Sequence, residues 1–151
     1  MKVLYFESIA NPSLKVLNIP ELTRIGHKKG VIVLVNNMFA PKMIFVARLG
    51  VDVVVHNLTK FINGGGDSIT RAVCGSKSFV NSLMDFQQGG IMLLGPTMDA
   101  KVTFEISERI LHLGFRMKEH GRRALEYATR LKKLRIKVHY QGLKNTYNTK
   151  F

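Results

Sequence analysis

Three apolar runs without polar alternation constrain the fold of this chain more than any other feature of its sequence. The runs are VLYFES (3–8), VIVLVNN (31–37) and VDVVVH (51–56), and β-branched residues dominate the second and third. Continuous apolar runs of this length are typical of strands in parallel sheets, which are covered on both faces. Each run is also far shorter than the roughly 18 apolar residues of a membrane-spanning helix.

Helical stretches separate the three runs. Pro20 and Gly30 frame the first stretch, and Pro41 and Gly50 frame the second, which matches the preference for proline at a helix start and glycine after its end. The resulting β-α-β-α-β order predicts an α/β fold with a parallel sheet.

The second half of the chain is predicted to be mainly helical. Residues 69–75 suit a further short strand, 76–88 a helix, and 97–134 one long amphipathic helix whose apolar positions recur every three or four residues. The segment KVHYQGL (137–143) suggests a strand that enters another domain.

Composition narrows the class of protein. The 151 residues include 23 Lys and Arg against 10 Asp and Glu, and 13 of those basic residues lie in 101–151. A basic face can bind nucleic acid, but no nucleic-acid motif accompanies it, so we favour a solvated helix face over a nucleic-acid partner, and we expect no membrane partner. The single cysteine, Cys74, excludes an internal disulfide and suits the cytoplasm. The face comprises Arg116, Lys118, Arg122, Arg123, Arg130, Lys132, Lys133, Arg135 and Lys137.

Polar residues follow each of the three apolar runs. ESIANP follows the first, NNMFAP the second and HNLTKFINGGGD the third. Because ligands of open α/β sheets bind at the carboxyl ends of the strands, these clusters are expected to converge on one crevice. Lys60 is the strongest candidate, since a lysine there can form a Schiff base with an aldehyde; by spacing alone, a solvated lysine before a flexible turn is the commoner case.

The order of these motifs resembles a known family. ESIANP, VIVLVNNMFAP, VDVVVHNLTKFINGGGD and RAVCG follow one another as in the Cys/Met-metabolism (transsulfuration) family of pyridoxal-phosphate (PLP) enzymes, and most resemble its plant methionine γ-lyase branch. The resemblance implies part of a PLP-dependent transferase-like (fold type I) large domain. It further implies that a long helix joins this domain to a small one that is missing. On this basis the chain divides into a partial PLP-binding large domain (1–96), a linking helix (97–136) and the start of a truncated C-terminal domain (137–151).

The same resemblance implies roles for five residues. Lys60 matches the catalytic lysine that carries PLP as a Schiff base. Thr59 and Asn57 match positions on the PLP phosphate, Asn11 lies near the ring hydroxyl, and Asn36 matches the residue paired with the pyridine nitrogen. Family members cleave or exchange groups on sulfur amino acids, typically as oligomers with sites shared between subunits.

Three positions depart from the family pattern. Asn36 replaces an aspartate whose charge keeps the pyridine nitrogen protonated, so the ring is a weaker electron sink. Asn57 replaces a serine, and Met38 replaces a threonine. Members of the family are also much longer, and the regions that carry the phosphate loop and the substrate-binding arginine have no counterpart here.

Two main hypotheses therefore remain open from the sequence. The chain is a methionine γ-lyase-like carbon–sulfur lyase that acts on sulfur amino acids through Lys60. Alternatively, it is a non-catalytic remnant that binds PLP weakly or pairs with a full-length paralogue. The expected assembly is a homo-oligomer or a hetero-oligomer with such a paralogue. A basic nucleic-acid-binding protein ranks third.

Overall fold

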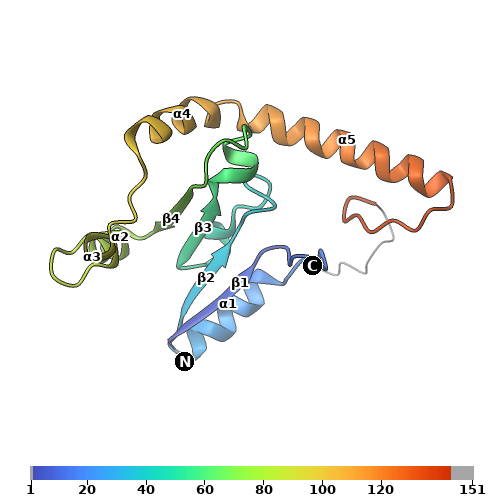
Figure 1. Cartoon of the computed structure of the whole chain (residues 1–151). Helices are drawn as coiled ribbons and strands as arrows, with labels where there is room; N and C mark the ends of the chain where they lie inside the picture. Colours follow the sequence, from blue (N-terminus) through green and yellow to red (C-terminus); the bar gives the residue numbers. More distant parts are fainter. Residues whose placement is uncertain (1, 144–151) are drawn as a thin grey trace.

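The computed structural model describes residues 2–143. It shows a small sheet from which two helical parts extend: an arm of two short helices within residues 77–94 and a pair of longer helices within residues 100–133 (Figure 1). None of the helices in this described part is long and apolar enough to cross a membrane. The elements run in the order β1 (Val3–Glu7), α1 (Ile19–Lys28), β2 (Ile32–Asn36), the 3-10 helix η1 (Val46–Leu49), β3 (Val53–Asn57), the π-helical turn η2 (Leu58–Ile62), β4 (Arg71–Gly75), α2 (Lys77–Leu83), α3 (Gly90–Leu94), α4 (Ala100–Ile110) and α5 (Leu113–Lys133).

The sheet has the strand order β1-β2-β3-β4. The first three strands are parallel, as predicted, with Glu7 beside Asn36 and Asn36 beside Val55. β4 runs antiparallel to β3, so the sheet is mixed and not purely parallel. A parallel fourth strand would need a crossover connection of a dozen or more residues that passes over the sheet. Residues 58–70 instead form η2 and a glycine turn at the end of β3, which returns the chain beside the strand it left.

The core lies between the sheet and α1. Val33 and Val35 on β2 are fully buried and pack with Ile19 of α1 and Val46 of η1. α1 approaches β2 closely because Gly26 has no side chain; a Cβ there would lie 2.6 Å from Val33 Cγ2. The valine-rich runs therefore form the central strands of the core, as their composition predicts.

The predicted second crossover helix is wrong over most of its length. Residues 41–50 contain only the short η1, and Gly50 ends it in the left-handed conformation (φ +87°). The side chain of Asn37 explains the irregular turn, because its Nδ2 donates to the carbonyls of Ala40 (3.3 Å) and Ile44 (2.9 Å). These bonds hold the chain in a side-chain-capped turn in place of a regular helix.

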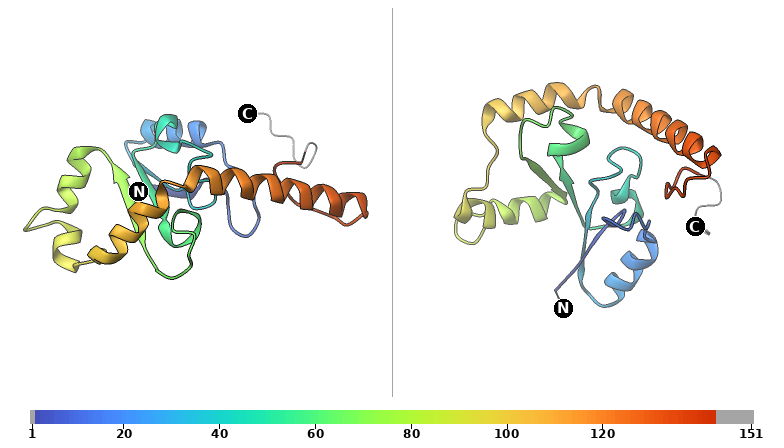
Figure 2. Two further views of the ribbon diagram at one scale, coloured as in Figure 1. Left: turned by 90° about the horizontal axis from the view of Figure 1, so that it is seen from above. Right: turned by 45° about the vertical axis from the view of Figure 1, so that its right-hand side comes forward.

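The predicted long helix over 97–134 is two helices, α4 and α5, separated at Leu111 and His112 (Figure 2). Arg116 of α5 contributes to this break, since its Nη1 donates to the carbonyl of Arg109 at 2.8 Å. The strand predicted over 137–143 is absent: these residues are irregular and form a turn, with no neighbouring strand in the described part to pair with. Residues 144–151 lie outside the described residues.

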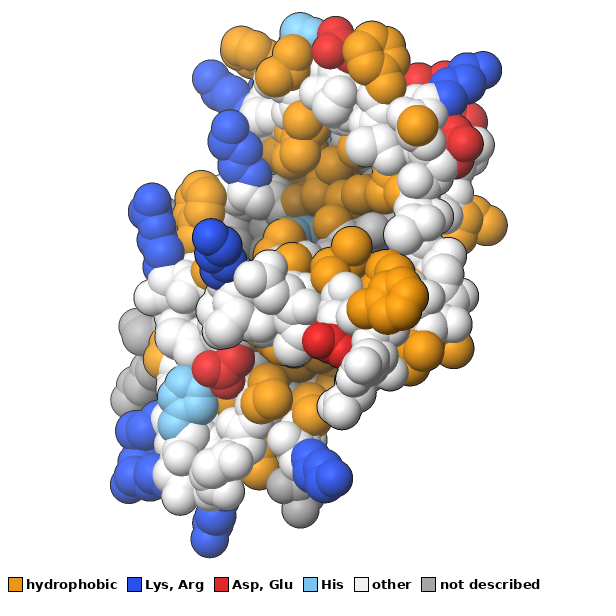
Figure 3. Space-filling view, turned by 90° about the vertical axis from the view of Figure 1, so that its left-hand side faces the viewer, with side chains coloured by type: hydrophobic (Ala, Val, Ile, Leu, Met, Phe, Trp, Pro, Cys, Tyr) orange, Lys and Arg blue, Asp and Glu red, His pale blue; other side chains and the backbone are white. Residues whose placement is uncertain are grey.

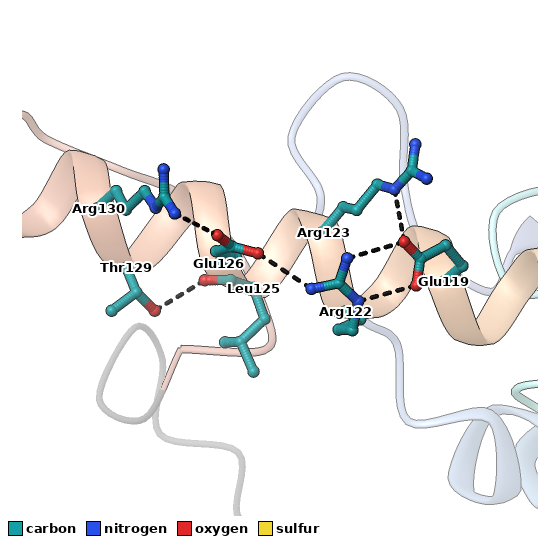
Figure 4. A network of polar contacts seen from close by, with 7 residues as sticks. All are labelled: Glu119, Arg122, Arg123, Leu125, Glu126, Thr129 and Arg130. Atoms are coloured by element: carbon teal, nitrogen blue, oxygen red, sulfur yellow. Dashed lines mark hydrogen bonds and ion pairs between the residues drawn. The ribbon is translucent and has the colours of Figure 1, made fainter.

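The outer side of α5 carries a ladder of ion pairs (Figure 4). Glu119 accepts hydrogen bonds from Arg122 (2.8 Å) and Arg123 (2.7 Å), and Glu126 links Arg122 to Arg130. The two arginines lower the pKa of Glu119 to about 2. Ion pairs of this spacing stabilise an exposed helix modestly. Three arginines of the predicted basic face are thus paired with glutamates of the same helix.

An exposed carboxylate at the edge of the core, Asp52, gives a pH-dependent stability. Asp52 Oδ2 accepts from the Val33 N–H (2.8 Å) and from His27 Nε2 (3.0 Å). Burial raises the pKa of Asp52, but these two bonds outweigh it and the pKa lies below its ordinary value. A lowered pKa contributes stability that is present above about pH 4 and is lost as the pH falls through the native pKa.

We therefore expect Asp52→Asn to flatten the acid limb of the stability profile. Between pH 5 and pH 3 the Tm of the wild type should fall by about 2 °C more than that of the variant, measured by circular dichroism. Glu108→Gln, at an exposed position of α4, is the control and should keep the wild-type slope. Parallel profiles for wild type and Asp52→Asn would contradict the assignment.

Candidate cofactor site

The polar clusters predicted to converge do meet at the carboxyl edge of β1, β2 and β3. Glu7 is the centre of the contact. Its Oε2 accepts from the backbone N–H of Asn11 (2.9 Å), and its Oε1 lies 3.5 Å from Asn36 Nδ2. Asn36 Nδ2 also lies 3.5 Å from the hydroxyl of Tyr5. The structure thus brings together Asn11 and Asn36 through Glu7.

Lys60 lies in η2, directly after β3, and is exposed. It is the residue of that turn with non-helical backbone angles (φ −90°, ψ −109°). Its carbonyl still accepts from the N–H of Gly64 at 2.8 Å, so the turn closes around it. A primary amine is therefore presented at the sheet edge from a constrained segment.

The residues just before Lys60 are tied to the start of β4. The hydroxyl of Thr59 accepts from the N–H of Thr70 at 2.9 Å and donates to its carbonyl at 3.3 Å. The N–H of Leu58 donates to the same carbonyl at 3.0 Å. The proton of Thr59 is thus directed at the protein backbone. Its predicted contact with a PLP phosphate stays a prediction and requires that hydroxyl to rotate.

Two side-chain oxygens at this edge are buried and have no hydrogen-bond partner among the described residues. They are Oδ1 of Asn36 and Oδ1 of Asn57. Within residues 2–143, Asn57 Nδ2 donates only to the sulfur of Met38 at 3.6 Å, and a thioether is a weak acceptor. An unsatisfied buried polar group costs about 1–3 kcal/mol. Both asparagines therefore have hydrogen-bonding capacity for a further group.

Two neighbours of the site are structural. Asn37 is 1% exposed, and its Oδ1 accepts from Ser8 Oγ at 2.8 Å. Its Nδ2 donates to the carbonyl of Ile44, in the turn that precedes η1. Burial lowers the pKa of His56, which favours the neutral ring at pH 7. His56 also lines an apolar cavity of about 610 Å³ with Leu58 and Ile62, but neither Lys60 nor Asn36 lines it. Figure 3 shows hydrophobic side chains gathered around a hollow on the side of the α2–α3 arm.

The turn after Lys60 contains contacts that the sequence did not predict. Arg109 Nη1 donates to Asp67 Oδ1 at 2.8 Å and to Asn63 Oδ1. Arg109, and then Asn63, hold the pKa of Asp67 well below its usual range. Arg116 was predicted to lie on a solvated face, but its guanidinium contacts the carbonyls of this turn. A seven-residue spacing, which places Arg109 and Arg116 on one helical face with the apolar stripe, was the available signal.

Comparison with known proteins shows which family the chain belongs to. The family model described as "Cys/Met metabolism PLP-dependent enzyme" matches residues 1–151. The chain belongs to this family. A methionine gamma-lyase of Arabidopsis thaliana is 59% identical over 142 residues, which are 94% of this chain and 32% of that protein. A cystathionine beta-lyase of Lactococcus lactis is 33% identical over 145 residues, 94% of this chain and 37% of the relative.

Solved structures agree on the fold of this Cys/Met-metabolism chain. A cystathionine gamma-lyase from Lactobacillus plantarum matches with a TM-score of 0.77 at 22% identity, over 87% of this chain and 34% of that one. A putative O-acetylhomoserine (thiol)-lyase from Campylobacter jejuni matches with a TM-score of 0.75 at 20% identity, over 87% and 40%. These neighbours are PLP-dependent fold type I enzymes, as the resemblance implied. The chain spans about a third of the length of the curated relatives it matches.

The cofactor of the Cys/Met-metabolism family is pyridoxal 5′-phosphate, and the residues at the sheet edge fit it chemically. Lys60 supplies an exposed amine. The unpaired Oδ1 of Asn36 can accept from a protonated ring nitrogen, and the weakly held Nδ2 of Asn57 can donate to a phosphate oxygen. Among residues 2–143, no group of three His, Cys, Asp or Glu side chains could hold a metal ion.

Proposed function

We propose that this chain carries the PLP-binding lysine of a methionine γ-lyase-like carbon–sulfur lyase and that Lys60 is this residue. The observation that carries the proposal is the exposed Lys60 amine in a distorted turn, at the edge where Asn36 leaves a buried acceptor unpaired. The 59% identity to the Arabidopsis methionine gamma-lyase supports the choice of reaction.

Each proposed role follows from the chemistry of the residue. PLP supplies an electron sink for the carbanion that forms next to the substrate nitrogen. Lys60 Nζ holds the cofactor aldehyde and moves the α-proton. Asn36 contacts the ring nitrogen, Asn57 and Thr59 contact the phosphate, and Asn11 lies near the ring hydroxyl. The substrate is a sulfur amino acid, which with one molecule of water gives a thiol, ammonia and a 2-oxo acid.

The proposed assembly is an oligomer, either of this chain or with a full-length paralogue that completes the site. The proposed location is the cytoplasm, where the exposed thiol of Cys74 stays reduced. Co-purification with a tagged full-length relative would test the paralogue partner directly.

One observation favours a second candidate, a non-catalytic subunit that retains PLP without efficient turnover. Asn36 carries no charge, so it holds the proton of the ring nitrogen less well than a carboxylate. This candidate predicts a PLP adduct on Lys60 together with little elimination activity, which separates it from the first.

Borohydride reduction of the PLP-loaded chain tests both candidates. We expect a pyridoxyl adduct at near-stoichiometric yield on the peptide that contains Lys60, because its environment and not mere exposure selects it. Exposed lysines such as Lys101 serve as internal controls in the same peptide map. Labelling scattered over many lysines would overturn the proposed function.

A further inference from the structure

The turn that follows Lys60 is held by arginines from distant helices. Arg116 of α5 donates through Nη2 to the carbonyls of Phe61 (3.2 Å) and Ile62 (2.7 Å). Its Nη1 donates to the carbonyl of Arg109, at the end of α4. One guanidinium therefore binds backbone oxygens one and two residues after Lys60 and links them to the junction between the helices.

Arg109 holds the next part of the same turn. It forms an ion pair with Asp67 (2.8 Å) and a hydrogen bond to Asn63 Oδ1. Asn63 is 2% exposed and donates in turn to Asp67 Oδ1 (2.8 Å) and Ser68 Oγ (3.1 Å). The charged pair thus closes a loop whose interior polar atoms bond to one another. Hydrogen bonds to charged groups are the strong ones in such networks.

These contacts and the backbone angles of the turn explain why glycine occupies positions 64–66. A Cβ on Gly65 would lie 2.7 Å from Arg109 Nη1, and one on Gly64 would lie 3.0 Å from Arg116 Nε. Gly64 and Gly66 also have positive φ angles, of +73° and +70°. The absence of side chains therefore lets both arginines approach the backbone of the turn.

Apolar packing supports the same contact. Leu58 and Ile62 of η2 form one buried cluster with Ile106 of α4 and with Leu113 and Met117 of α5. The helix pair therefore contacts η2 through its apolar stripe and Arg116, and contacts the following turn through Arg109. Along the chain, Lys60 lies between Thr59, which bonds to Thr70, and the Phe61 and Ile62 carbonyls that Arg116 binds.

From this arrangement we propose that Arg109 and Arg116 are positioning residues that fix the segment carrying Lys60 and so set the place of its amine relative to Asn36. The inference rests on the proposed function for its chemical meaning. The clamp, by which we mean Arg109, Arg116, Asn63 and Asp67, acts through the backbone and touches neither substrate nor cofactor.

Hydrogen–deuterium exchange of the PLP-free chain tests the clamp itself. In Arg116→Gln the amides of Asn63 and Gly64, which bond to the carbonyls of Leu58 and Lys60, should exchange about tenfold faster, because local opening becomes easier. Arg123→Gln removes the same charge from the exposed side of α5 and should leave these amides within about twofold of the wild type. Equal exchange in the two variants would overturn the clamp.

Labelling of Lys60 tests positioning as distinct from stability. In Arg116→Gln the rate of borohydride-trapped labelling at Lys60 should fall about tenfold at unchanged helicity, since a small displacement of a reacting group costs large factors in rate. Arg116→Lys should restore part of the rate. Faster exchange with unchanged labelling would overturn positioning and leave only a structural role.

If Arg116→Gln does not fold, a second pair of variants tests the same proposal. Gly65→Ala pushes Arg109 away without removing a charge, and Gly121→Ala on α5, whose added Cβ meets nothing within 4 Å, is its control. Slower Lys60 labelling in Gly65→Ala alone supports the proposal, and equal rates overturn it. Absence of wild-type labelling would overturn the proposed function alone, because exchange would still decide whether the arginines hold the turn.

Discussion

Lys60→Ala is expected to abolish the borohydride-stable PLP adduct and to lower carbon–sulfur elimination by about 10³-fold or more. The alanine removes both the amine that binds the cofactor aldehyde and the group that moves the α-proton, and proton transfer alone contributes typically 10²–10⁴-fold. Elimination is best measured as 2-oxo acid release by a chimera in which this chain replaces the matching segment of the Arabidopsis methionine gamma-lyase.

Two further variants show whether the loss is specific to the Lys60 amine. Lys60→Arg keeps the positive charge but cannot form the imine, so it should be as inactive as the alanine variant. Lys42→Ala removes an exposed lysine from the loop after β2 and should retain the wild-type adduct. Residual elimination above about a tenth of the parent activity in Lys60→Ala would show that another residue carries the chemistry.

Asn36→Asp in the same chimera is expected to raise elimination by about 10²-fold, the scale of a well-placed electrostatic contact in an active site. A carboxylate favours the protonated ring nitrogen and so strengthens the electron sink. The substitution also places a carboxylate near Glu7, whose Oε1 lies 3.5 Å from Asn36 Nδ2. Two facing carboxylates repel, so the PLP-free variant should be less stable, and PLP should raise its Tm more than that of the parent.

Asn37→Asp is the matched control, one residue along the chain. Asn37 donates to the carbonyls of Ala40 and Ile44, and an aspartate would instead present buried oxygens to those carbonyls. We expect a loss of about 3 kcal/mol in unfolding free energy and no gain in elimination. An equal gain at both positions, or none at Asn36, would show that the missing charge does not limit the reaction.

The parts of the fold that depend on composition and on the order of segments along the chain could be predicted from the sequence. The runs around Val33 and Val54 are buried strands because β-branched residues pack well on a pleated surface, and the parallel order of three strands followed from the intervening segments. The convergence of Glu7 and Asn36 followed from the same order, since carboxyl ends of parallel strands meet at one edge.

The predictions that were wrong concern segments held by individual bonds from side chains to backbone carbonyls. No local pattern shows that Asn37 would hold the carbonyl of Ala40 and prevent a regular helix. The spacing that places Arg116 beside the apolar stripe does not show which carbonyls it binds. In the sequence, Arg116 was grouped with the other basic residues of the helix, because only its position relative to the apolar stripe distinguishes it from them. A single bond from a side chain to a carbonyl, such as that from Arg116 to Arg109, leaves no periodicity, so the break between α4 and α5 was not predictable.

The position of β1 has a practical consequence for handling the protein. β1 is an edge strand that pairs only with β2 in the described part of the chain, and Tyr5 on it is 58% exposed. The outward backbone groups of such a strand form a template on which an extended segment of another molecule can add. Intermolecular strand addition grows with concentration, so dilution disfavours it.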